Sequence, residues 1–413
     1  MRSDSGAGAK RGGSGAKPPT TMTALVLGAL FTVGAGCGTT GQKANVVKLA
    51  AAKPEAVEAL KEAARSVRLG AANWDRALER LRAAQQLDPK LWEAFYDEGW
   101  ILLKQHHPED AIAPLEKALA IYPTHAATVE ALGEAYSGAG RSSDAARIFK
   151  GYIDRVGAEA KVPVRVALGA AQRRAGKLDD ALETLRAALR LAEKKEQPPA
   201  LNQMALVYLA KQQLELADLV LKKALDVDDK SKAAADTWNN LGLIALARRK
   251  DQEAFAHFDQ ASRLDPQLVV ARRNKAVVYL DCGDYQKAAE ELKQVVKADA
   301  QDASAWVALG VAERGRGSLD AAARAYERAL ELAGTGPDAA DALFDLAILH
   351  MEFKKEPARA KERFEQFLKT AASSHPKRAD AEARLKELGQ KLAPAAPSTP
   401  PPASDTVKSG GST

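Results

Sequence analysis

An alanine recurs along this chain at a nearly constant interval, and that interval constrains the fold more than any other feature. Successive copies lie 34 to 38 residues apart, at Ala77, Ala111, Ala145, Ala181, Ala217, Ala254, Ala288, Ala322 and Ala360. A repeat of this length with two helix-sized apolar stretches is typical of helical hairpins that bury their faces by stacking on neighbours. One small residue per repeat is expected because a larger side chain would separate the two helix axes where they cross.

The residues around the alanines follow a specific pattern. The clearest unit reads Trp238, Leu241, Gly242, Ala254, Phe258, Ala261 and Pro266, and another reads Trp306, Leu309, Gly310, Gly317, Ala322, Tyr326 and Ala329. This pattern resembles the tetratricopeptide repeat family. The resemblance implies an all-α fold, a right-handed α-solenoid of about nine tetratricopeptide hairpins over residues 58–375. Placing each start nineteen residues before its alanine predicts units beginning near 58, 92, 126, 162, 198, 235, 269, 303 and 341.

The C-terminal end differs from the repeats. Residues 377–392 form an expected amphipathic helix, with Ala381, Leu385, Leu388 and Leu392 on one side. We interpret it as a capping helix that covers the last repeat, and a partner-binding helix is the alternative. Residues 393–413 are rich in Pro, Ser and Gly with almost no large apolar side chain, so we predict a disordered tail.

The N-terminal end has the composition of an export signal. Basic residues precede the apolar run 23–36, which is too short to span a membrane and ends in small residues. Residues 33–37 resemble a bacterial lipobox, which implies a signal peptide over 1–36, a lipidated Cys37 and a lipid-anchored linker over 37–57. An ordinary secretion signal is the alternative. By resemblance to the sorting rule of bacterial lipoproteins, Gly38 favours the periplasmic face of the outer membrane.

Charge and cysteine content narrow the possible partners. The formal charge is +6, and residues 1–36 contribute four basic and one acidic side chain, so +3 remains after them. This small excess argues against a nucleic-acid partner. Only two cysteines exist, and Cys282 has no disulfide partner if Cys37 is acylated. We expect Cys282 to be a buried small apolar residue.

No residue pattern predicts catalysis. His106 and His107 lie before Pro108, where we expect the turn between two helices, and the other histidines lack ligand spacing. The glycines do not form a phosphate-binding loop after a strand. We therefore predict no enzyme activity, no metal site and no cofactor.

The family resemblance implies a binding groove on the concave side, where first helices usually contact ligands through their second, fifth, ninth and twelfth positions. The fifth-position candidates are Tyr96, Asn202, Asn239 and Arg273, the ninth-position candidates are Trp100, Leu206, Leu243 and Val277, and Arg314 occupies a twelfth position. We expect an extended peptide or a helix to bind there. The alternative is that these side chains only pack between neighbouring first helices.

These features together lead to a functional expectation. Lipid-anchored tetratricopeptide chains resemble scaffolds of gliding-motility complexes, so we expect protein partners within an envelope-spanning complex and a membrane contact through the lipid. A pilotin-like factor for a type IV pilus secretin, and a scaffold for outer-membrane or cell-wall assembly, are the alternatives. Asn239 and Arg273 resemble part of the carboxylate clamp of chaperone-binding relatives, but Asp236 and Leu246 do not fit it. We therefore do not predict binding of chaperone tails.

Overall fold

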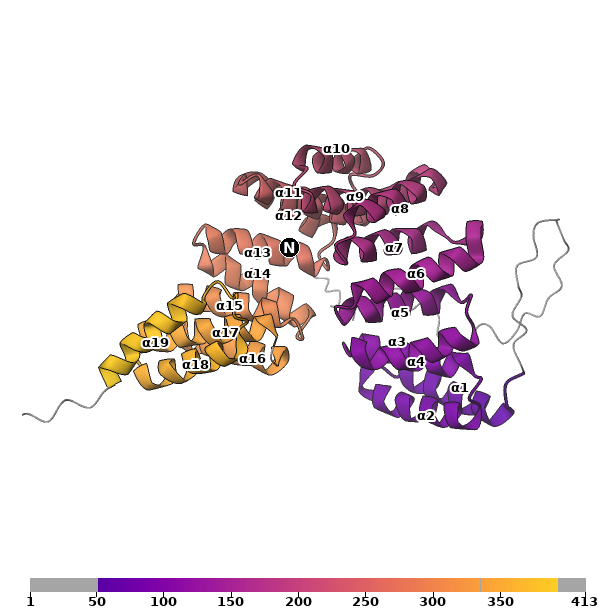
Figure 1. The fold of residues 1–413 in the computed structure, drawn as a ribbon, viewed down its shortest axis with the longest axis horizontal. Helices are drawn as coiled ribbons and strands as arrows, with labels where there is room; N and C mark the ends of the chain where they lie inside the picture. The colour runs from indigo at the N-terminus through magenta and orange to yellow at the C-terminus, as the bar shows by residue number, and fades with distance from the viewer. Residues whose placement is uncertain (1–50, 335, 393–413) are drawn as a thin grey trace, which may run out of the picture. The chain divides into compact units, whose positions relative to one another are not determined.

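The computed structural model describes residues 51–334 and 336–392 (Figure 1). These residues form α-helices joined by short turns, which confirms the all-α repeat fold. They belong to two compact units that divide between Glu193 and Lys194. The predicted signal peptide, Cys37 and the tail 393–413 lie outside the described residues. Within the described ranges, no helix has the length and apolarity needed to cross a bilayer.

Residues 51–193, the described part of the first unit, form four hairpins. Each hairpin consists of a first and a second helix, which contact each other and the first helix of the next hairpin. The pairs are α1 (Pro54–Arg68) with α2 (Trp74–Leu87), α3 (Trp92–Lys104) with α4 (Pro108–Ile121), α5 (Ala126–Gly138) with α6 (Ser142–Val156), and α7 (Val162–Arg174) with α8 (Leu178–Leu191). Short 3-10 turns cover Ala71–Asn73 and Gly157–Glu159. One apolar cluster runs through the stacked helices from Ala56 to Ala171.

The second unit continues the same pattern and adds a final helix. Its hairpins are α9 (Gln197–Ala210) with α10 (Leu214–Leu225), α11 (Ala235–Ala247) with α12 (Asp251–Leu264), α13 (Val269–Asp281) with α14 (Tyr285–Ala298), α15 (Ala303–Gly315) with α16 (Leu319–Ala333), and α17 (Pro337–Ile348) with α18 (Pro357–Thr370). The final helix is α19 (Arg378–Leu392). Short 3-10 turns cover Lys194–Glu196 and Lys232–Ala234, and a π-helical turn covers Leu349–Phe353.

The recurring alanines lie on the second helix of each hairpin and face its packed interior. All nine are completely buried. A glycine of the first helix contacts the second helix one turn after the alanine. A Cβ added to Gly242 would stand 2.4 Å from Cε1 of Phe258, and one added to Gly310 would stand 2.4 Å from Cε1 of Tyr326. In these two hairpins a large ring therefore packs directly against the backbone of the first helix, and at Gly99 and Gly169 a leucine does so.

The turn inside each hairpin is fixed by the backbone. Five residues before the alanine, φ is positive in eight of the nine described hairpins, at His106, Gly140, Gly176, Gln212, Arg249, Gly283, Gly317 and Lys355. The next N–H donates back to a carbonyl near the end of the first helix, as in Arg141 N to Tyr136 O at 2.7 Å. This left-handed cap with its six-to-one hydrogen bond stops the first helix. It also places His106 and His107 in a turn, as the sequence indicates.

The helix starts match the repeat frame in the middle of the chain and differ at its ends. First helices begin at 92, 126, 162, 235, 269 and 303, the predicted residues, and α9 begins one residue early. Both α1 and α17 begin four residues early, at Pro54 and Pro337. Proline is favoured in a first helical turn because that turn needs no N–H there. A longer turn in the first hairpin and the π-helical turn in the last supply the extra residues.

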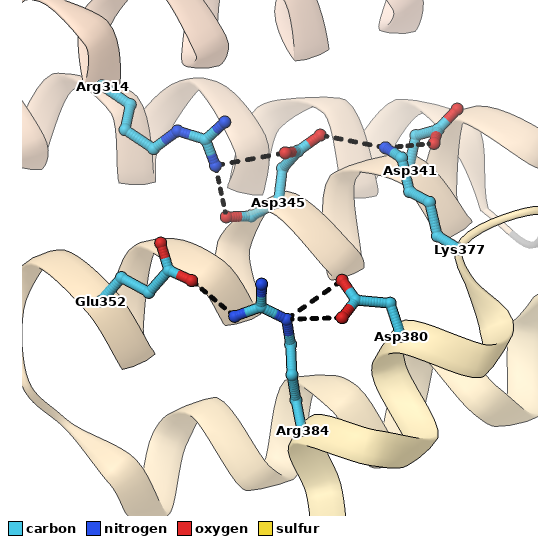
Figure 2. A network of polar contacts seen from close by, with 7 residues as sticks. All are labelled: Arg314, Asp341, Asp345, Glu352, Lys377, Asp380 and Arg384. Atoms are coloured by element: carbon cyan, nitrogen blue, oxygen red, sulfur yellow. Dashed lines mark hydrogen bonds and ion pairs between the residues drawn. The ribbon is translucent and has the colours of Figure 1, made fainter.

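The helix α19 covers the last hairpin. Ala381 and Leu388 are buried against a cluster that includes Phe364 and Phe367, and Leu385 is partly buried there. Figure 2 shows the polar contacts that accompany this packing: Arg384 of α19 binds Glu352 in the π-helical turn and Asp380 of its own helix. The expected capping helix is thus present, and it begins at Arg378.

Cys282 corrects one sequence expectation. It is exposed, whereas we expected a buried residue. It directly follows α13 and precedes Gly283, which has a φ of 75°. The chain leaves the helix at this turn, so the side chain is directed away from the packed face.

Candidate functional site

The first helices of the second unit carry the predicted groove residues on neighbouring elements. Helix α11 contacts α9 on one side and α13 on the other. We call Asn202, Leu206, Asn239, Leu243, Arg273 and Val277 the first-helix row. Equivalent positions of stacked repeats recur at the same place on each first helix, so these side chains follow one another from α9 to α13.

Asn202 has an unusual environment at the start of this row. This residue is only 6% exposed, and its side-chain carbonyl oxygen has no hydrogen-bond partner among the residues that the structure describes. A buried acceptor without a donor costs about 1 to 3 kcal/mol, because the bond it made to water is lost on folding. Such a group is retained at a cost to stability, which makes it a candidate for contact with a partner's donor.

Asn239 is engaged within the chain. Its Oδ1 accepts a hydrogen bond of 2.8 Å from Nδ2 of Asn274, which joins α11 to α13. The Asn239 side chain is also buried. One acceptor site of its carbonyl oxygen is therefore already used, and its amide nitrogen is the group that a partner accepting hydrogen bonds would contact.

Each of the two arginines of the predicted groove pairs with a carboxylate, Arg273 with Asp302 at the start of α15 and Arg314 with Asp345 of α17. Nη1 of Arg273 lies 2.9 Å from Oδ2 of Asp302 and 3.3 Å from Oγ of Ser304. Nη1 of Arg314 lies 3.2 Å from Oδ1 of Asp345 (Figure 2). Because both guanidinium groups already have a carboxylate, an acidic partner would compete with it or bind the N–H donors that it leaves open.

The carboxylate of Asp345 also belongs to a longer chain of charges. Nζ of Lys377 lies 3.5 Å from Oδ2 of Asp345 and 2.8 Å from Oδ1 of Asp341, as Figure 2 shows. The same ammonium group lies over the ring of Phe344, 5.1 Å from its centroid. Lys377 thus links the segment before α19 to α17, and Arg314 links α17 to α15.

The apolar part of the first-helix row is partly accessible. Leu206 and Leu243 are half-buried, and Val277 is 37% exposed. Exposure therefore increases toward α13. These three side chains could provide apolar contact area, while the polar members would fix the orientation of a partner.

The predicted aromatic residues lie in the first unit and differ in accessibility. Tyr96 is buried, with its ring 6.4 Å from Trp92 and 5.5 Å from His125. Burial raises the pKa of its hydroxyl to about 12, and nearby carboxylates add to the shift. Trp100 is half-buried beside Trp74, with Nζ of Lys104 over its ring at 5.7 Å. Of the two, Trp100 is the residue that a partner can reach.

A buried carboxyl adjoins this aromatic cluster. The side chain of Asp97 is 4% exposed, and burial raises its pKa to about 7, with a smaller contribution from the charge of Glu93. Burial likewise raises the pKa of Glu93. Asp97 is therefore largely protonated below neutral pH, and no sequence pattern pointed to it.

The partners of the groove residues were also missed from the sequence. Asn274 and Asp302 lie outside the second, fifth, ninth and twelfth positions. Asp345 occupies a fifth position if the last repeat begins at 341. The repeat frame therefore places Asp345 on the same face as Arg314 of the preceding repeat, and a pair between them could have been proposed from the sequence. The frame assigns positions to a face, but it does not say which side chains pair across repeats.

The described residues do not form a site with obvious chemistry. Among residues 51–334 and 336–392, no group of three His, Cys, Asp or Glu side chains is placed to hold a metal ion. The candidate site consists instead of amides, paired charges and apolar side chains on the first helices of successive repeats. This arrangement is suited to hold a chain segment across several repeats.

Comparison with family models agrees with the repeat geometry. Tetratricopeptide repeat models match residues 66–126, 202–269, 273–337 and 312–356, and related models match 165–199 and 341–374. These matches cover more than half of the chain. The chain therefore belongs to the tetratricopeptide repeat family, whose repeats form scaffolds that bind protein partners and are typically not enzymes.

Individual relatives share only parts of the chain. It is 29% identical over 102 residues to the heat-shock protein cognate co-chaperone sgt12 of Aspergillus fumigatus, which is 25% of this chain and 30% of that protein. It is 40% identical over 60 residues to the TPR repeat-containing protein PA0015 of Pseudomonas aeruginosa, which is 14% of this chain and 57% of that one. The crystal structure of the APC/C hetero-tetramer Cut9-Hcn1 has a similar fold, with a TM-score of 0.51 and 18% identity over 76% of this chain and 59% of that chain.

Proposed function

We propose that this protein is a lipid-anchored scaffold on the periplasmic face of a bacterial outer membrane, where its repeats hold components of an envelope-spanning gliding-motility complex. The anchor part of the proposal rests on the lipobox-like residues before Cys37 and on Gly38. Two or three acyl chains would retain the protein on a bilayer, because each buried methylene contributes roughly 0.8 kcal/mol.

The binding part of the proposal rests on Asn202. Its carbonyl oxygen is buried at the start of the first-helix row and receives no hydrogen bond from the described part of the chain, and the row continues to the exposed Val277. An extended segment laid across α9, α11 and α13 has backbone N–H groups that can supply a donor after the amide of Asn202 rotates toward it. Its apolar side chains would cover Leu206, Leu243 and Val277.

The hydrogen bonds of the groove residues determine which variant tests the groove best. Replacing both Asn239 and Arg273 by alanine would remove the bonds to Asn274 and Asp302, so the fold itself would lose stability. Asn202→Ala removes no bond to the carbonyl oxygen. We expect it to weaken partner capture without lowering the unfolding midpoint.

The experiment combines this variant with the anchor variant. The protein is tagged at its C-terminus, cells are crosslinked, and recovered partners are identified by mass spectrometry for wild type, Asn202→Ala, Cys37→Ala and the control Glu327→Ala on α16. Partners lost with Asn202→Ala and kept with the control support the groove. Undiminished capture by Asn202→Ala contradicts it, and unchanged partners and membrane retention with Cys37→Ala contradict the anchor.

A gene deletion distinguishes the machineries. Loss of surface gliding with pili still assembled supports the motility scaffold. Loss of secretin multimers would instead identify a pilotin-like factor. Altered cell shape or detergent sensitivity with normal motility would identify a scaffold for outer-membrane or cell-wall assembly.

A further inference from the structure

The second helix of the α9–α10 hairpin exposes an apolar stripe that its position in the repeat does not explain. Leu216 is 43% exposed and Leu219 is 62% exposed, and the half-buried Val220 lies beside them. These residues share one face of α10 because they are three and four positions apart. We call Leu216, Leu219 and Val220 the α10 stripe.

Comparison with the other repeats shows that these are solvent positions. Leu216 and Leu219 stand one residue before and two residues after the crossing alanine Ala217. In the other described second helices the same two positions are exposed or half-exposed and hold Arg76 and Glu79, Asp110 and Ala113, Asp144 and Arg147, Asp180 and Glu183, Glu253 and Ala256, Lys287 and Glu290, Ala321 and Arg324, and Arg359 and Glu362. Only α10, among these helices, has a large apolar side chain at both.

The neighbouring helices do not cover the stripe. A cleft of about 650 Å³ separates α10 from α12, and the α10 side chains that line it are Glu215, Asp218, Lys222 and Leu225. These form the adjacent face of α10, so the stripe is directed away from the cleft. The second unit thus leaves Leu216 and Leu219 partly exposed to water, which is unfavourable by about 25 cal/mol for each Å² of exposed apolar surface.

The charges along α10 indicate what could cover the stripe. The N-terminal half carries Glu215 and Asp218, and the C-terminal half carries Lys222 and Lys223. Two copies of such a helix attract each other when they lie antiparallel, because each acidic half then faces a basic half. If the twofold axis passes through Leu219, Glu215 of each copy faces Lys223 of the other copy, which gives two attractive pairs.

The existing contacts leave these groups available. Glu215 already lies 2.8 Å from Nη2 of Arg248, but its side chain is 89% exposed and can contact a second cation. Lys222 pairs with Asp218 along the same helix at 2.7 Å, and Lys223 is exposed. The carboxylate and the ammonium group at the two ends of the stripe therefore face solvent.

We propose that the α10 stripe is a self-association surface at which two copies of this chain pair their α10 helices antiparallel about a twofold axis at Leu219. The helix has twelve residues and is about 18 Å long. One helix pair of this length buries less than the roughly 1,200 Å² of a standard interface, so the dimer is weak, with a dissociation constant on the order of tens of micromolar.

The first test measures molecular mass by sedimentation equilibrium. The full chain carrying Cys37→Ala is examined at about 1 to 200 µM, a range that brackets the expected dissociation constant. Leu219→Glu places two carboxylates at the axis and should weaken the dimer at least about tenfold. Ala256→Glu, the same repeat position on α12, should leave it unchanged. A wild-type chain that stays monomeric, or a Leu219→Glu chain that dimerises as wild type does, overturns the proposal.

The second test examines the antiparallel arrangement. Glu215→Lys alone and Lys223→Glu alone each place like charges opposite each other and should weaken self-association. A mixture of the two variants restores both attractive pairs, so mixed dimers should form with about wild-type affinity. Differently labelled chains report this by energy transfer. If the mixture associates no better than either variant alone, the antiparallel pairing is wrong.

Discussion

The buried carboxyl of Asp97 should make the stability of the first unit depend on pH, and one substitution tests this prediction. Asp97 lies in α3 of the first unit, and burial raises its pKa from the ordinary value of 3.8 to about 7. In the unfolded chain it ionises near the ordinary value, so between these two values the folded protein holds a proton that the unfolded chain releases. Asp97→Asn keeps the shape of the protonated acid and cannot ionise.

The magnitude follows from the difference between the two pKa values. Because the folded-state pKa is the higher one, this group's contribution to stability is complete below about pH 4 and is lost as the pH rises toward 7. One pKa unit corresponds to 1.36 kcal/mol, so the free energy of unfolding falls by about 4 kcal/mol over this interval. Asp97→Asn avoids the loss, and it should be nearly neutral at pH 4 and more stable than wild type by about 4 kcal/mol at pH 8.

A local probe is needed, because repeat arrays do not always unfold in one step. We would follow amide hydrogen exchange of α3 in urea at pH values from 4 to 8, and compare wild type with Asp97→Asn. Asp110→Asn, which changes an exposed carboxyl at the start of α4, is the matched control. A difference between wild type and Asp97→Asn that stays constant with pH would refute the reasoning, since a protonated buried carboxyl would then not exist.

Three further predictions concern packing, the cap and the thiol. Ala254→Leu should overpack a buried helix crossing and lower the free energy of unfolding by about 1 to 3 kcal/mol in urea, whereas Ala256→Leu on the exposed side of the same helix should change it little. Arg384→Ala should loosen α19 by about 1 kcal/mol, seen as faster amide exchange, and the difference should shrink in 1 M salt because salt weakens the ion pairs of the wild type. Equally fast exchange in Lys386→Ala would show that the ion pairs are not the cause. Cys282 should react with a thiol reagent in the folded protein nearly as fast as in urea, and strong protection would contradict its exposure.

The repeat fold was predictable because its main constraint is periodic. An alanine that is needed at every helix crossing reports the length of the unit, and the structure buries all nine of them. The two terminal hairpins broke the fixed offset, since their first helices start at Pro54 and Pro337 and their turns are longer. A repeat keeps the regular length when it packs against a repeat on each side, so the lengths of the helices and turns of the two terminal hairpins can vary.

The candidate site was less predictable from sequence. The repeat frame named Asn239, Arg273 and Arg314, but it did not identify Asn274, Asp302 or Asp345 as the groups that hold them. Pairing across repeats depends on side-chain conformations, which a position number does not contain. Asp97 is a related case, because an acidic residue in a helix looks solvated until the packing of its neighbours is known.

The turns inside the hairpins have a consequence for engineering the protein. His106, Gln212, Arg249 and Lys355 adopt the left-handed conformation that glycine adopts in the other four turns of this kind. A residue with a side chain is strained there by roughly 1 kcal/mol, which the greater freedom of glycine in the unfolded chain only partly offsets. All four side chains are exposed and lie outside the first-helix row and the α10 stripe. Because these residues belong to separate repeats, the gains in stability from glycine at each position should be nearly independent. Substitutions in the hairpin turns can therefore raise the thermal stability of the protein without altering any surface proposed to bind a partner.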